Sequence, residues 1–145
     1  MSLDHIVPVL QLAIGPVIVI SGAGLVLLSM TNRFGRIIDR ARSLGESIRS
    51  GSLSETHLIY SQLLILTRRA RLLRLAIALT STSLLLAAFL VIALFLIVLL
   101  DFEAASLIIV IFSSCMATLI VGLLFFIADI NVSLAALKLE IDVEK

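Results

Sequence analysis

Residues 68–103 read RRARLLRLAIALTSTSLLLAAFLVIALFLIVLLDFE. A basic cluster leads into the uncharged, apolar run 75–100, which ends at the acidic turn 101–103. This run is longer than the roughly 20 residues that a helix needs to cross a hydrocarbon core about 30 Å thick. The segment therefore predicts a transmembrane helix with a basic approach on one side of the membrane and an acidic turn on the other.

Two further runs of the same character lie on either side of it, at residues 6–30 and 104–128. The chain has 145 residues, 61% of them hydrophobic, and a mean hydropathy of +1.22. Three spans take up about half of this length and leave too little for a separate soluble catalytic domain. We therefore predict one all-α integral membrane domain, 1–145, with three transmembrane helices.

The basic residues are strongly segregated along the chain. Of the eleven Lys and Arg residues, all except Lys138 and Lys145 fall between Arg33 and Arg74, whereas the turn 101–103 has none. Loops rich in Lys and Arg stay in the cytoplasm by the positive-inside rule. This pattern predicts that the N-terminus and the acidic turn lie outside and that the Arg-rich connection and the C-terminus lie in the cytoplasm.

Helical periodicity continues beyond the membrane. Apolar positions recur at helical spacing after the first span, which predicts that this helix runs on to about Arg49. Ser52 and Glu55 then form a capping-box pattern for a second helix. Beyond the third span, apolar residues recur at 4-3-4 spacing. We predict a cytoplasmic bundle formed by a helical hairpin at 31–74 and a C-terminal helix at 129–144.

Small residues in the first span recur every seven positions, at Pro8, Gly15, Gly22 and Ser29. Such a face lets another helix approach closely, either inside the subunit or between subunits. It also suits a pore wall, where polar atoms alternate with apolar constrictions that gate by dewetting. The pore-lining candidates, which we call the glycine stripe, are Gln11, Gly15, Ile18, Gly22, Leu25, Ser29 and Asn32.

Two further sets of small residues in the second and third spans predict helix-packing faces rather than an ion path, because membrane hydroxyls usually bond carbonyls of their own helix. The sets are Ala76, Thr80, Ser83 and Ala87 in the second span, and Ser114, Thr118 and Gly122 in the third.

A few charged residues lie at the ends of the spans. Asp129 is the acid nearest the third span, and we expect it to pair with Arg33 or Arg74 near an inner pore mouth. Asp101 and Glu103 lie in the external turn. In a closed ring of subunits these two acids would repeat around an acidic external rim and attract cations.

Enzyme chemistry finds little support in the sequence. His5 and His57 are expected on opposite sides of the membrane, and no nucleophile elbow, phosphate loop or metal-ligand spacing is present. We therefore expect no enzyme activity, no cofactor and no metal. The arginines are interleaved with acids, so we expect no nucleic-acid partner. Anionic lipid headgroups remain as partners, at about 1 kcal/mol for each exposed basic residue near the surface.

Three landmarks together carry a resemblance to a known family. They are Thr31-Asn32-Arg33-Phe34 after the first span, Arg68-Arg69-Ala70 before the second, and Phe125-Phe126-Ile127-Ala128-Asp129-Ile130 at the end of the third. With these landmarks, the chain resembles small bacterial three-span inner-membrane proteins catalogued as a domain of unknown function. The resemblance covers nearly the whole chain and implies the bacterial inner membrane, but no activity and no functional residues.

Two functions fit these observations. The first is a homo-oligomeric ion channel of four or more subunits, in which the glycine stripe lines the path and the external acids favour cations; a single three-helix subunit is too small to enclose a hydrated path. The alternative is a non-conducting membrane scaffold or sensor whose cytoplasmic helices bind a partner or anionic lipid.

Overall fold

The computed structural model describes the backbone of residues 3–49, 56–100 and 105–143, and the side chains of residues 7, 8, 10–49, 60, 62–100 and 105–134. Within these ranges the chain is entirely helical. Ser52 and Glu55 of the predicted capping box, and Asp101 and Glu103 of the predicted acidic rim, lie outside the described residues.

Three long helices make up the fold: α1 (Leu3–Arg49), α2 (Thr56–Leu100) and α3 (Ala105–Val143). Each contains a segment long and apolar enough to cross a membrane. At 1.5 Å per residue, even the shortest helix, with 39 residues, is far longer than a hydrocarbon core about 30 Å thick. The prediction of an all-helical membrane protein with three transmembrane helices is confirmed. The first helix ends at Arg49, as its periodicity predicts.

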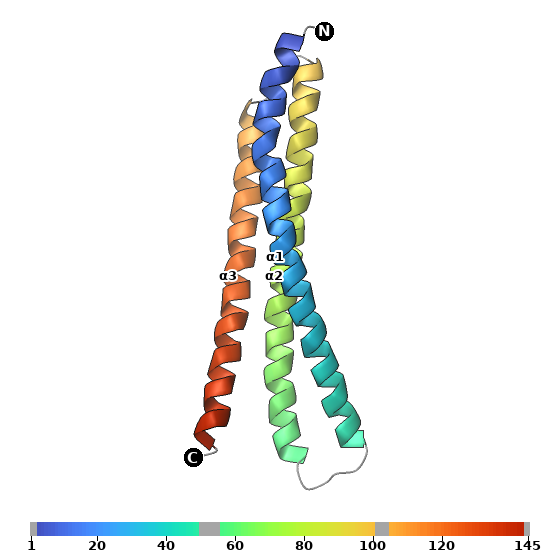
Figure 1. The fold of residues 1–145 in the computed structure, drawn as a ribbon, viewed down its shortest axis with the longest axis vertical. Helices are drawn as coiled ribbons and strands as arrows, with labels where there is room; N and C mark the ends of the chain where they lie inside the picture. Colours follow the sequence, from blue (N-terminus) through green and yellow to red (C-terminus); the bar gives the residue numbers. More distant parts are fainter. Residues whose placement is uncertain (1–2, 50–55, 101–104, 144–145) are drawn as a thin grey trace.

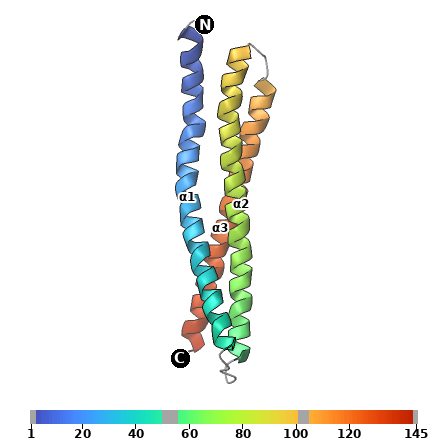
Figure 2. The same cartoon turned by 90° about the vertical axis from the view of Figure 1, so that its right-hand side faces the viewer.

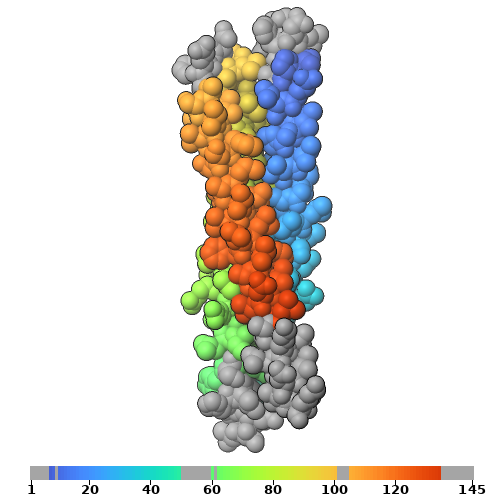
Figure 3. All heavy atoms as spheres, turned by 90° about the vertical axis from the view of Figure 1, so that its left-hand side faces the viewer, coloured from blue at the N-terminus to red at the C-terminus, as the bar shows by residue number. Residues whose placement is uncertain are grey.

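The central helix is α2. Both α1 and α3 pack along it, whereas they meet each other at only a few points (Figures 1 and 2). We call the end where α1 stops and α2 begins the hairpin end. There, α3 diverges from the other two helices towards its C-terminus (Figure 1). The space-filling view shows α3 in front of α2, with α1 along the right-hand edge (Figure 3).

Each helix contacts its neighbours through a seam of buried residues with a period close to 3.5. In α2 the seam alternates steps of three and four, and in α1 and α3 it returns every seventh residue. This period is that of left-handed supercoiled packing. The seams are Leu73, Ala76, Thr80, Ser83, Ala87, Leu90 and Leu94 in α2; Pro16, Ala23, Met30 and Ile37 in α1; and Cys115, Gly122 and Asp129 in α3.

Small and polar side chains hold α2 and α3 together inside the apolar segment. The Ser83 hydroxyl donates to the Cys115 carbonyl at 2.9 Å, and the Cys115 thiol donates to the Ser83 carbonyl at 3.2 Å. Two turns further along α3, Gly122 brings the backbones so close that a Cβ there would lie 2.9 Å from Thr80 Oγ1 and 3.2 Å from Thr80 N. Close approach through small residues, with hydrogen bonds between helices, is how membrane helices associate.

The predicted packing face of the second span is confirmed, because its four residues are all almost fully buried. The face predicted for the third span is wrong in part. Gly122 is buried, but Ser114 is exposed and the seam passes through Cys115 instead. The four-residue spacing of the small residues drifts around the helix, whereas a seam facing one neighbour follows the seven-residue period.

Gly122→Ala is expected to lower the free energy of unfolding by about 1–3 kcal/mol, because the new methyl group meets the backbone of α2 as well as a side chain. Reversible unfolding in mixed micelles of mild detergent and SDS, followed by far-UV circular dichroism, measures the change.

Gly45→Ala is the matched control. A Cβ at Gly45 meets no atom within 4 Å, so the better helix propensity of Ala should raise stability slightly, by up to about 1 kcal/mol. Equal effects of the two substitutions would contradict the packing described for α2 and α3.

Candidate functional site

The glycine stripe faces away from the rest of the chain. All seven of its residues are exposed, including Ile18 at 65% and Leu25 at 72%. A Cβ added at Gly15 or Gly22 would meet no atom within 4 Å. The interpretation of the stripe as a packing seam inside the subunit is therefore wrong. The other two interpretations, a contact between subunits and a pore wall, are compatible with an outward face.

The glycine stripe faces outwards because the buried seam of α1 is offset by one residue from the small residues of the heptad. The α1 seam runs through Pro16, Ala23 and Met30, each directly after a small residue of the heptad that the sequence displays. One residue turns a helix by about 100°. The side chains of the seam and those of the glycine stripe therefore point in clearly different directions, and only the seam meets α2.

The three helices meet at a compact core towards the hairpin end. Met30 and Ile37 of α1 pack with Leu73 and Ala76 of α2. Partly buried side chains from all three helices surround these four, namely Val26, Phe34, Leu66, Ala70, Ile77, Leu123, Phe125 and Phe126. This core lies at the end of the apolar part of α1. Asp129 follows Phe126 by three residues on α3, so it lies about one turn further along that helix.

Asp129 is fully buried, at 0% exposure, and lies between one arginine from each of the other helices. Its Oδ2 is 3.6 Å from Arg33 Nη2 on α1, and its Oδ1 is 3.5 Å from Arg69 Nε on α2. Both distances exceed those of a charge-assisted hydrogen bond, so the contacts are ion pairs without direct hydrogen bonds. The Arg33 guanidinium also lies 5.5 Å from the centre of the Phe126 ring, in a cation–π contact.

The structure thus brings Asp129 to Arg33, whereas Arg74, the alternative partner expected from the sequence, is exposed and takes no part. The second partner is Arg69. Counting back from Leu73 and Ala76 along the α2 seam leads to Arg69, four residues before Leu73, while Arg74 lies one residue off the seam. The seam period was therefore the signal in the sequence that identifies the partner.

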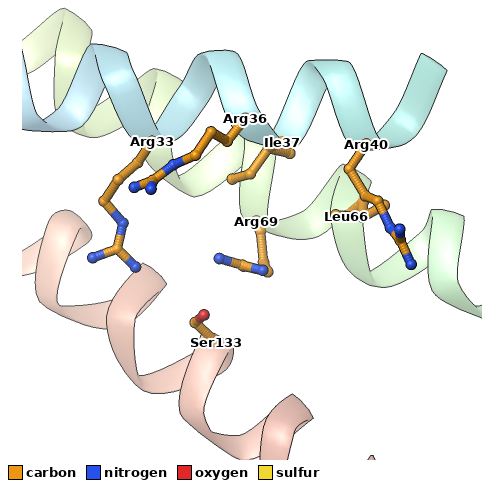
Figure 4. A pocket seen from close by; sticks show the side chains of 7 residues that line it. All are labelled: Arg33, Arg36, Ile37, Arg40, Leu66, Arg69 and Ser133. Carbon is orange, nitrogen blue, oxygen red and sulfur yellow. The ribbon is translucent and has the colours of Figure 1, made fainter. Parts of the chain in front are cut away.

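A cavity of about 300 Å³ opens beside this ion pair, between all three helices (Figure 4). Arginines dominate its wall, and three of them come from one face of α1 (Figure 4). Its lining residues are Arg33, Arg36, Ile37 and Arg40 of α1, Leu66 and Arg69 of α2, and Ser133 of α3. We call this cavity the arginine pocket. From the sequence, Arg33 was expected in an ion pair here, and Arg36 and Arg40 were expected on the surface that would bind a partner. The pocket itself was not predicted, because it depends on how α2 and α3 are rotated against α1.

The described residues hold no group of three or more His, Cys, Asp or Glu side chains that could bind a metal ion. Comparison with known families gives one match, over residues 13–139, to a family described as "Protein of unknown function (DUF2721)". The chain belongs to this family. The match includes the seams of all three helices and the cluster around Asp129. No curated protein and no solved structure matches the chain.

The family description of DUF2721 names no activity, so the chemistry of this member must be argued from its own residues. Its most unusual group is the buried carboxylate. A buried charge is costly unless it is paired, and removing one partner of such a pair typically costs 3–5 kcal/mol, while replacing the whole group by apolar residues is often neutral. We therefore expect the ion pair of Asp129 to specify how the helices fit together more than it adds stability.

Asp129→Asn in this DUF2721 protein is expected to lower the free energy of unfolding by about 3 kcal/mol, because it leaves two partly buried guanidinium groups without an anion. Arg69→Met should cost less, since Arg33 still compensates the carboxylate. A double-mutant cycle of these two substitutions, read by unfolding in SDS, should give a clear coupling energy.

Arg74→Met is the control, because Arg74 sits on the same helix but is exposed, and its effect should stay within about 0.5 kcal/mol. If Arg69→Met and Arg74→Met proved equally mild and the coupling with Asp129 were zero, the ion pair would have no structural role.

Proposed function

We propose that this DUF2721 protein assembles into a ring in the bacterial inner membrane and conducts ions through a central path lined by α1. The observation that carries the proposal is the exposed glycine stripe, which no other part of the described chain covers. In a ring, α2 and α3 of each subunit face outwards and α1 faces the axis, which is the arrangement that an α1 packed mainly on α2 favours.

The composition of the stripe supports a pore wall over a face in contact with lipid. Gln11 and Asn32 place exposed amides near its two ends, and polar groups lose their hydrogen bonds to water if lipid surrounds them. Glycine costs about 1 kcal/mol relative to alanine inside a helix. Gly15 and Gly22 have free space beside them, and their cost is offset where a helix of another subunit approaches closely or where the path must be wide. Between them, Ile18 and Leu25 supply apolar constrictions.

The proposed orientation follows from the basic residues. The hairpin end, with its arginines, faces the cytoplasm, and the turn between α2 and α3 faces outwards. Asp101 and Glu103 would then repeat around the external mouth of the ring and raise the local concentration of cations. The narrow apolar part of the path would lie between this mouth and the arginine-rich inner end.

A second candidate is a non-conducting scaffold or sensor whose cytoplasmic end binds a partner or an anionic lipid. The arginine pocket favours it, since a basic cavity at the membrane border suits recognition rather than conduction of cations. In this case the glycine stripe would join two subunits without enclosing water.

Native mass spectrometry of the protein released from lipid nanodiscs is expected to show one closed stoichiometry of about four or more subunits, since a ring of this size makes a central path lined by α1 geometrically possible. A monomer or dimer under conditions that retain lipid would exclude a pore lined by α1 and leave the scaffold as the working hypothesis.

Leu25→Asn is expected to raise the leak of cations from liposomes several-fold, because an amide at the apolar constriction favours wetting of the path. Potassium flux into liposomes that contain the reconstituted protein, reported by an enclosed potassium-sensitive dye, measures the leak. Ile109→Asn, at a 64% exposed apolar position on α3, is the matched control and should leave the leak unchanged. Equal leaks for the two variants in particles of normal mass would contradict the assignment of α1 to the path.

A further inference from the structure

We propose that the arginine pocket is a binding site for a phosphate-bearing anion. The proposal does not depend on conduction, because it rests on the charges, the donors and the depth of the cavity itself. Four guanidinium groups line one space of about 300 Å³, and they come from two helices that are far apart in the sequence.

The charges in and around the pocket do not cancel. Arg33 and Arg69 share the single carboxylate of Asp129. Arg36 and Arg40 are exposed, and no carboxylate of the described side chains lies within ion-pair distance of either. Counting the lining residues and Asp129 alone, four guanidinium groups against one carboxylate leave three positive charges in excess. A space with this imbalance attracts an anion, and most strongly one with more than one negative charge.

The donors that line the pocket come from all three helices. Arg33, Arg36 and Arg40 are spaced i, i+3 and i+7, so they lie on one face of α1. Arg69 from α2 and Ser133 from α3 point towards the same space (Figure 4). Planar guanidinium groups bind phosphate oxygens in pairs of parallel hydrogen bonds, and a serine hydroxyl adds a neutral donor. Buried Arg69 Nε has no hydrogen-bond partner among the described residues, which leaves one donor aimed at this region unsatisfied.

The size of the pocket limits what it can hold. A volume of about 300 Å³ is at the lower end of the range for small-molecule sites. It accommodates a phosphate or diphosphate group with part of its ester. Ile37 and Leu66 provide the apolar part of the wall, against which a glycerol or similar carbon backbone can pack.

The depth of the pocket places it at the border of the membrane. Arg33 lies three residues beyond the first apolar run, about 4.5 Å along the helix, and Arg40 lies about 15 Å along it. Headgroups extend about 5–7 Å beyond the hydrocarbon core on each side. One end of the pocket is therefore level with lipid phosphates, and the other end is open to soluble phosphate compounds.

The test uses the full-length protein in nanodiscs of phosphatidylcholine, with two arms that distinguish the sources. In the first arm, phosphatidic acid is added to the nanodiscs and retained lipid is counted by native mass spectrometry. In the second, inorganic pyrophosphate is titrated calorimetrically against a chloride control of equal ionic strength. Specific binding in at least one arm is expected.

The variants Arg36→Gln and Arg40→Gln should each weaken that binding about tenfold, the loss of one charge-assisted hydrogen bond. Both residues are exposed and outside the ion pair of Asp129, so the fold should persist. Arg42→Gln and Arg71→Gln are matched controls, because they remove the same charge from exposed positions of α1 and α2 outside the pocket, and binding should stay unchanged.

Binding of phosphatidic acid alone would identify a lipid headgroup as the occupant, and binding of pyrophosphate would identify a soluble anion; both support the site. The proposal is overturned if neither probe binds above the chloride control. It is also overturned if the control variants weaken binding as much as Arg36→Gln and Arg40→Gln, because the attraction would then belong to the whole basic surface.

Discussion

The arrangement of the three helices depends on one buried carboxylate. Asp129 is fully enclosed, and its charge is compensated only because α1 and α2 each bring an arginine within 4 Å of it. A purely apolar contact between helices can shift at modest cost, because apolar side chains of similar volume replace one another. A buried charge with two defined partners resists such a shift, so we expect this contact, together with the close approach at Gly122, to set the register of α1 and α3 along α2.

The same contact is one of the few places where α1 and α3 touch. Elsewhere α1 and α3 each pack against α2. The contact with α3 is a close backbone approach at Gly122, and the contact with α1 includes Met30 and Ile37. The side of α1 that does not meet α2 remains uncovered along the membrane segment, while the arginines beyond it surround a cavity. Both proposed activities of the protein thus follow from the position of α1 at the edge of the molecule.

The sequence was sufficient for the number of spans and for the end of α1, because each depends on the local run of apolar or charged residues. It was also sufficient for the packing face of α2, where Ala76, Thr80, Ser83 and Ala87 are small and buried. It was not sufficient to predict which face of α1 packs against α2. The small residues at Gly15 and Gly22 draw attention, but the actual seam lies one residue further, at Pro16 and Ala23. The rotation of a helix is a property of its neighbours, which also explains why Arg69 and the arginine pocket became apparent only with the fold.

The buried ion pair also has a consequence for the order in which the protein is made. Membrane helices first insert singly and then associate. The first two helices supply both arginines, and the third supplies the acid. Arg33 and Arg69 are therefore synthesised before the carboxylate that pairs with them. Docking of α3 is most favourable once α1 and α2 have come together, because the buried carboxylate of Asp129 then meets both arginines. The docking of α3 therefore depends on correct pairing of α1 and α2, and an incorrectly paired hairpin would weaken it.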